Sequence, residues 1–149
     1  MALAVQAQSV QAPIPLAPLQ ASTLTGARFD QQQLSGKVAI VYFWSTACPV
    51  CRDSLPELRT NQAGWRNKPF ALVTVNVDRN SEDWQTYERI LAKTRPASAG
   101  LITLRQDSGI APPGKLPLTL LVDAKGKVVA RYEGRLAPEA WDGVADLMP

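Results

Sequence analysis

Cys48 and Cys51 are the only two cysteines of this 149-residue chain, and only Pro49 and Val50 separate them. The chain contains no histidine, which excludes Ser-His-Asp and Cys-His catalysis and every histidine metal ligand. Two thiols this close can form a disulfide and exchange it with another disulfide, or they can bind a soft metal ion. The chemistry of the chain is therefore expected at this pair.

The flanking residues predict that the cysteine pair lies where a strand passes into a helix. Residues 37–44 contain a continuous apolar run, typical of a central strand buried on both faces. Residues 49–61 have the apolar spacing of an amphipathic helix, with Cys51 on its apolar face. Free N–H groups and the helix dipole would stabilise a thiolate at Cys48. We expect Cys48 to be exposed and nucleophilic, and Cys51 to be shielded.

Three other uses of two close cysteines have to be compared with thiol exchange. Structural zinc needs further cysteine or histidine ligands, and the chain has none. Copper(I) can be bound by two thiolates alone, although the 2 methionines of the chain provide no methionine-rich surroundings. An inert pair, reduced or locked in a structural disulfide, is the third alternative.

The rest of the pattern predicts an α/β domain. Strands alternate with helices, and the second strand should pair parallel to the first. The chain should close with an antiparallel hairpin and a final helix that starts near Pro138. The further elements expected are a strand over 70–77, a helix capped by Asn80 or Ser81 that ends near Arg95, and hairpin strands over 117–123 and 127–132.

The N-terminal residues differ from the rest in composition. Residues 1–27 carry no charged side chain, but glutamines and prolines interrupt every stretch that could span a bilayer or serve as a signal peptide. We interpret residues 1–22 as a flexible segment rich in Ala, Gln and Pro, the remnant of a removed signal or anchor, with Met1 added for expression. Residues 23–149 then form the folded domain.

The charge balance gives no indication of a polyanionic partner. Sixteen basic against thirteen acidic residues give a net charge of +3 and a pI near 9.1. The basic residues are scattered among acidic and apolar positions, without interleaved aromatic residues that could stack on bases. Nucleic-acid binding is therefore not expected.

Several motifs together resemble the active site of thioredoxin-fold proteins, in particular the bacterial TlpA/ResA/DsbE-like branch. The resemblance extends over about residues 24–148. The matching features are the Leu-x-Gly-Lys entry at Leu34 to Lys37, the strand ending in Trp44, the Cys-x-x-Cys pair, Pro56 five residues after Cys51, and the Pro-x-Thr-x-x-x-Asp-x-x-Gly stretch from Pro117 to Gly126. The resemblance implies a thioredoxin-like fold, with a central mixed β-sheet flanked by helices.

The resemblance also implies roles for individual residues. Cys48 would be the attacking thiol and Cys51 the resolving thiol, and no bound cofactor would be required. Pro117 would be the cis-proline that faces the disulfide, preceded by Leu116, whose backbone would bind an incoming peptide. The expected contact surface for a partner protein consists of Trp44, Pro49, Val50, Leu116 and Pro117.

Two positions depart from the family pattern, and the motif of a related group is absent. Tyr42 occupies the strand position that holds a buried acid in thioredoxin, so proton transfer at Cys51 lacks that carboxylate, for which Glu57 or water could substitute. Ala47 stands where the family often has tryptophan. The Pro-x-x-x-Thr-x-x-Cys pattern of peroxiredoxins is absent, because Thr46 lies only two residues before Cys48.

These observations predict a thiol-disulfide oxidoreductase that forms a mixed disulfide with partner proteins at Cys48. The uncharged Pro-Val loop favours the reducing end of the thioredoxin range. The resemblance implies a periplasmic reductant, acting on cytochrome c maturation partners or other oxidised thiols and supplied by a membrane electron donor; the native protein could carry a membrane anchor that this chain lacks. The alternatives are a periplasmic disulfide donor and a copper(I)-binding module of the same fold.

Overall fold

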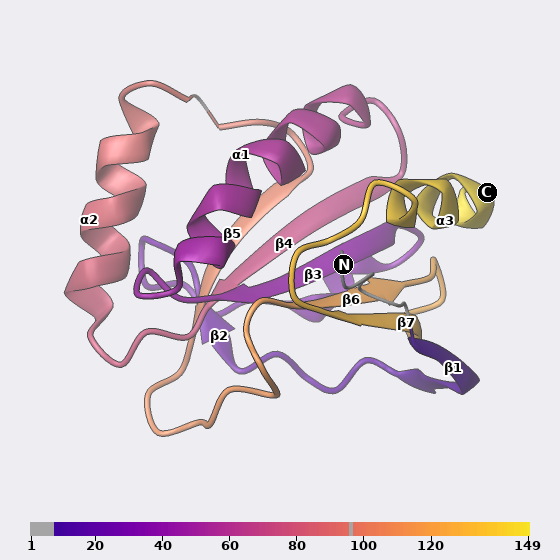
Figure 1. The fold of residues 1–149 in the computed structure, drawn as a ribbon, viewed down its shortest axis with the longest axis horizontal. Coiled ribbons are helices and arrows are strands. Elements are labelled where there is room, and N and C mark those ends of the chain that lie inside the picture. Colours follow the sequence, from indigo (N-terminus) through magenta and orange to yellow (C-terminus); the bar gives the residue numbers. More distant parts are fainter. Residues whose placement is uncertain (1–7, 96) are drawn as a thin grey trace, which may run out of the picture.

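A computed structural model describes residues 8–95 and 97–149 of the chain. Seven strands form one mixed sheet in the order β1-β7-β6-β3-β4-β5-β2 (Figure 1). The strands are β1 (Gln8–Pro15), β2 (Ala21–Ser22), β3 (Val38–Trp44), β4 (Phe70–Asn76), β5 (Leu101–Gln106), β6 (Leu118–Val122) and β7 (Lys127–Glu133). The helices are the short 3-10 helix η1 (Gln31–Leu34) and the α-helices α1 (Pro49–Gly64), α2 (Ser81–Ala92) and α3 (Ala140–Leu147).

The centre of the sheet follows from the apolar run in the sequence. Strand β3 pairs parallel to β4 and antiparallel to β6, and every residue of β3 and β4 is buried. Strands buried on both faces need apolar side chains at successive positions, which is what these two segments have. The predicted α/β architecture, the parallel pairing and the β6–β7 antiparallel hairpin are confirmed.

One face of the sheet carries the three α-helices. Alternate residues of β3, including Ile40 and Tyr42, share one core cluster with Leu55 of α1, Trp84 of α2 and Val144 of α3. Figure 1 shows α1 lying diagonally across this face, with α2 and α3 at its two ends. Because α1 begins directly after β3, its packing on this face brings the two cysteines to the edge of the sheet where β3 ends.

The opposite face is covered by the N-terminal segment, and here the expectation of a flexible segment over residues 1–22 is wrong for residues 8–22. Strand β1 pairs with β7, and β2 pairs with β5. Leu16 and Ala21 are buried, with 8% and 2% of their surface exposed. Their apolar side chains complete the core below β3, which outweighs the local preference of a Pro- and Gln-rich stretch for open structure. Residues 1–7, Met1 among them, lie outside the described residues.

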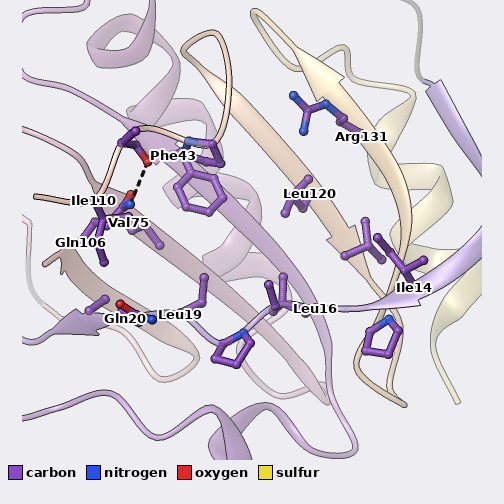
Figure 2. A pocket seen from close by; sticks show the side chains of 17 residues that line it. Ile14, Leu16, Leu19, Gln20, Phe43, Val75, Gln106, Ile110, Leu120 and Arg131 are labelled. Carbon is purple, nitrogen blue, oxygen red and sulfur yellow. Dashed lines mark hydrogen bonds between the residues drawn. The ribbon is translucent and has the colours of Figure 1, made fainter.

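A cavity of about 470 Å³ lies on this second face (Figure 2). Phe43, Val75 and Leu120 line it from the sheet, Leu16 from the N-terminal segment and Ile110 from the loop after β5. Successive side chains of a strand point to opposite faces, so Phe43 faces the cavity whereas Tyr42 faces the helices. The cavity and the cysteine pair are thus on opposite sides of the sheet.

Several element boundaries differ from those predicted. Helix α1 continues through Pro56 to Gly64, and α3 begins at Ala140, two residues after Pro138. Strand β5 has no counterpart among the predicted elements and extends the parallel part of the sheet beyond β4. Of the helices in the described ranges, none is long and apolar enough to cross a membrane.

Candidate active site

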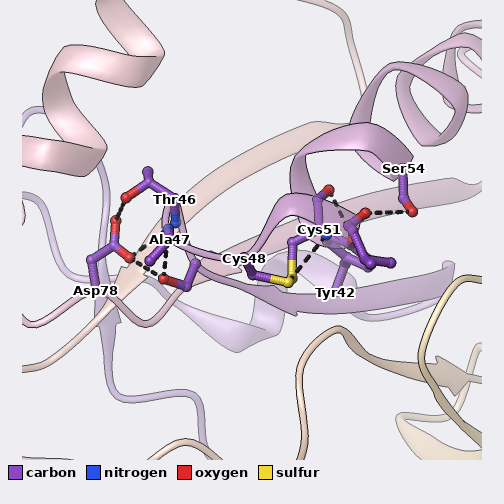
Figure 3. The surroundings of a disulfide bond; sticks show 9 residues. Tyr42, Thr46, Ala47, Cys48, Cys51, Ser54 and Asp78 are labelled. Atoms are coloured by element: carbon purple, nitrogen blue, oxygen red, sulfur yellow. Dashed lines mark hydrogen bonds between the residues drawn. A yellow bond between two sulfur atoms is a disulfide. The ribbon is translucent and has the colours of Figure 1, made fainter.

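Cys48 and Cys51 are joined by a disulfide at the start of α1 (Figure 3). Their Cα atoms lie 5.2 Å apart, a distance common for bridged cysteines. Cys48 is the N-cap residue of α1, and its sulfur accepts a hydrogen bond from the backbone N–H of Cys51 at 3.2 Å. Pro49 occupies the first turn of the helix, where its missing N–H would have had no partner within the helix.

The two cysteines differ in their access to solvent. Cys48 is partly exposed, whereas Cys51 is completely buried, at 0% exposure, within the core cluster below α1. A partner molecule can therefore approach Cys48 and not Cys51. Helix α1 produces this difference, because Cys48 precedes the helix and Cys51 lies one turn into its apolar face.

Tyr42 lies beneath the disulfide. Its hydroxyl donates a hydrogen bond of 3.0 Å to the carbonyl oxygen of Cys51 (Figure 3). Burial raises the pKa of the Tyr42 phenol above its already high ordinary value, so the phenol stays protonated at neutral pH and supplies a donor, not a base. Glu57 is exposed and pairs with Arg135 at 3.2 Å, which directs its carboxylate to solvent.

The residues expected at the contact surface all lie near the same edge of the sheet, but they are not all exposed. Pro49 and Val50 are exposed, Val50 at 46%. Leu116 and Pro117 are joined by a cis peptide bond directly before β6. Leu118 pairs with Phe43 near the end of β3, so this bond lies at the edge from which the cysteine loop leaves the sheet. Leu116 is half-buried and Pro117 is buried.

Trp44 does not fit its expected place on the contact surface. Its side chain is fully buried, at 0% exposure, and packs against Tyr87 with ring centroids 4.9 Å apart. Trp44 is the last residue of β3, and the alternation along the strand directs it toward the helices along with Tyr42. Trp44 therefore belongs to the core cluster that also contains Cys51, and it is not available for contact with a partner.

Sequence reasoning missed Asp78, whose carboxylate accepts hydrogen bonds from Ser45 and Thr46 in the loop before Cys48 (Figure 3). It also missed Arg105, which donates hydrogen bonds to the backbone carbonyl of Asp78. The available signal was the position of Asp78 just after β4, at the edge where the parallel strand β3 also ends.

The described part of the chain holds no group of three His, Cys, Asp or Glu side chains close enough to bind a metal ion. A metal at this site would have to be held by the two thiolates of the reduced protein, as in the copper(I) alternative.

Comparison with known proteins places this site among redox proteins. Residues 7–143 match the model of the AhpC/TSA family. The thiol-disulfide oxidoreductase ResA of Bacillus cereus is 23% identical over 120 residues, which cover 80% of this chain and 68% of that protein. The soluble secreted antigen MPT53 of Mycobacterium tuberculosis is 47% identical over only 38 residues, 26% of this chain and 22% of that protein.

A solved structure shares the whole architecture. The thioredoxin domain of a thiol-disulfide oxidoreductase from Bacteroides vulgatus superimposes with a TM-score of 0.70 at 22% identity. The match covers 94% of this chain and all of that chain, 100%. This agreement establishes the thioredoxin-like fold.

Proposed function

The chain belongs to the AhpC/TSA family and is a thiol-disulfide oxidoreductase, and we propose that it reduces disulfides of other proteins outside the cytoplasm through a mixed disulfide at Cys48. The observation that carries this proposal is the unequal exposure of two bonded cysteines, because Cys48 is partly exposed and Cys51 is fully buried. Thiol exchange with a protein needs one sulfur that a partner can reach and a second that is kept close to it.

The proposed reaction moves two electrons from this chain to the partner. The thiolate of reduced Cys48 attacks one sulfur of the partner disulfide, forming a mixed disulfide and releasing the first partner thiolate. Cys51, as thiolate, then attacks the sulfur of Cys48, which forms the internal disulfide and releases the second partner thiolate. Both released thiolates take up a proton, and the two cysteines of this chain have lost theirs.

One feature supports a reducing direction. Neither Pro49 nor Val50 carries a charge that would stabilise the Cys48 thiolate, and a less stable thiolate makes a dithiol a better electron donor. We infer that a separate donor returns electrons to the disulfide after each cycle, without a cofactor bound to this chain, and that in the native setting this donor lies in a membrane.

The proposed location outside the cytoplasm has support from the relatives. MPT53 is named as a secreted protein, and disulfide exchange of this kind is most needed where protein thiols become oxidised. For a partner protein, the proposed contact surface is formed by Val50 and Pro49 next to Cys48 and by the half-buried Leu116. Pro117, which is buried, adjoins Leu116 at the same edge of the sheet.

Trapping experiments test the roles of the two cysteines. The variant Cys51→Ala should accumulate mixed disulfides with a protein that carries scrambled disulfides, because the second attack is missing. The variant Cys48→Ala should form none, since its remaining thiol is buried. Equal amounts of mixed disulfide with both variants would contradict the assignment.

The reduction potential tests the direction. Thioredoxin-fold dithiols range from about −270 mV to about −120 mV. We expect a value below about −230 mV for the Cys48–Cys51 pair, measured against glutathione and dithiothreitol buffers with thiol labelling as the readout. A value near −120 mV would make the protein a disulfide donor. Failure to form the disulfide, with copper retained after anaerobic purification, would favour the metal-binding alternative.

A further inference from the structure

One carboxylate holds the loop that leads from β3 to the cysteine pair. Asp78 accepts hydrogen bonds from the Ser45 hydroxyl, from the Thr46 backbone N–H at 3.0 Å and from the Thr46 hydroxyl at 2.7 Å. The Asn76 side-chain amide donates a fourth, at 3.1 Å. Hydrogen bonds to an ionised acceptor are stronger than neutral ones, so Asp78 fixes both residues of the loop to the end of β4.

The same loop fixes Cys48. The backbone N–H of Cys48 donates to the carbonyl of Ser45 at 3.1 Å, and the N–H of Ala47 donates to the Ser45 hydroxyl, also at 3.1 Å. Residues 45–48 therefore form a closed turn, and Asp78 is bonded to both residues at its beginning. Figure 3 shows Asp78 and Thr46 on one side of this turn and the disulfide on the other.

The backbone of Asp78 is itself fixed by hydrogen bonds from the neighbouring strand β5. Arg105 of β5 donates hydrogen bonds to the carbonyl oxygen of Asp78 at 3.2 and 2.9 Å and to that of Arg79 at 3.1 Å. The N–H of Val77 donates to the carbonyl of Trp44 at 2.9 Å, continuing the β3–β4 pairing to the edge of the sheet. Three parallel strands thus anchor the carboxylate, and through it the cysteine turn.

We propose that Asp78 is a positioning residue for thiol exchange: it keeps the turn at residues 45–48 in the conformation that holds Cys48 against Cys51, and so favours the disulfide over the dithiol. This inference rests on the proposed redox cycle at Cys48. Holding two reacting groups in place raises their effective concentration, which strengthens the disulfide. The negative charge of Asp78 near the turn also disfavours the Cys48 thiolate. This effect likewise favours the disulfide over the dithiol.

The test compares three full-length variants by their equilibrium with dithiothreitol. Asp78→Ala removes the acceptor and the charge, and Asp78→Asn keeps an oxygen for the Thr46 N–H but loses the charge. Asp123→Ala is the matched control, because the Asp123 carboxylate also fixes a turn, accepting the N–H groups of Lys125 and Lys127 at 2.9 Å each, in the β6–β7 hairpin.

We expect the equilibrium constant for disulfide formation to fall about tenfold in Asp78→Ala, a rise in potential of about 30 mV, with a smaller fall in Asp78→Asn. In Asp123→Ala it should stay within about twofold of the parent chain even though the fold is weakened. An unchanged constant in folded Asp78→Ala, or an equal fall in Asp123→Ala, overturns the inference. If Asp78→Ala does not fold, an unchanged equilibrium constant for disulfide formation in Asp78→Asn overturns the inference.

This measurement needs no partner protein and is independent of the direction of electron flow in the cell. A high potential in the parent chain would refute the reducing role proposed above, while the difference between Asp78→Ala and Asp123→Ala would still report on positioning.

Discussion

Replacing Tyr42 by phenylalanine separates two roles that its hydroxyl could have beneath the cysteine pair. The hydroxyl donates one hydrogen bond, to the Cys51 carbonyl, and both residues are fully buried. A hydrogen bond of this kind contributes about 0.5–1.5 kcal/mol to stability. The carbonyl of Cys51 lies within α1, where the helical hydrogen bond still satisfies it, so the loss should stay near the middle of that range, about 1 kcal/mol.

For a chain of this length, a loss of about 1 kcal/mol lowers the melting temperature by about 2–4 °C. Urea unfolding of the oxidised protein, followed by tryptophan fluorescence, measures the same loss as a shift of the midpoint. Tyr132→Phe is the control, since Tyr132 is a second buried tyrosine of the same core cluster and lies on β7.

The exchange chemistry should respond differently. Because burial raises the pKa of the Tyr42 phenol, the hydroxyl keeps its proton at neutral pH and cannot accept one from Cys51. We therefore expect Tyr42→Phe to leave the rate of exchange with a small disulfide within about threefold of the parent, with the same pH profile. A tenfold loss, or a displaced pH profile, would refute this reasoning and make Tyr42 a proton-transfer group.

Two further predictions concern stability. Leu16→Ala should lower the free energy of unfolding by about 2 kcal/mol in urea, because Leu16 is buried below the sheet. The control Ile14→Ala, at a side chain that is 59% exposed, should lower it by less than about 0.5 kcal/mol. Equal small losses in the two variants would show that the N-terminal segment adds nothing to the core. Burial raises the pKa of Glu88 despite its 3.3 Å ion pair with Arg59. The folded chain therefore binds the proton of this carboxyl group more tightly than the unfolded chain does. The free energy of unfolding should fall as the pH rises from about 4.5, the ordinary pKa, through the raised pKa. Glu88→Gln cannot ionise and should flatten that fall above about pH 4.5, and a variant that keeps the slope of the parent would contradict the assignment.

The core of the site could be predicted because its signals are local. The run that forms β3 is apolar at every position, and Pro49 at the first turn of α1 marks the start of the helix. The placement of Cys48 outside α1 and Cys51 inside it follows from these two signals alone. Helical spacing also placed Cys51 on the buried face, so the difference in exposure between the two cysteines could be predicted from the sequence.

Other features depend on contacts that no local pattern reveals. Strand β5 has mostly half-buried residues, which weakens the periodic signal of a strand, and its partner β4 lies a whole helix away in the chain. The N-terminal segment has the composition of a linker, yet its few apolar residues dock on a sheet face that is completed only by folding. For Trp44, the family resemblance implied a surface role, whereas its place in a strand that is buried on both faces puts it in the core.

Asp78 lies between these two cases. Its hydrogen bonds to Ser45 and Thr46 join residues more than thirty positions apart, so no short motif contains them. The parallel pairing of β3 with β4 was nevertheless predicted, and its register sets Trp44 beside Asn76. The residues that follow both strands must then meet at one edge of the sheet. An acidic residue at that edge has acceptor oxygens that match the donors opposite, which are two hydroxyl groups and a backbone N–H. Strand register combined with side-chain chemistry thus locates the positioning residue that the cysteine motif by itself does not.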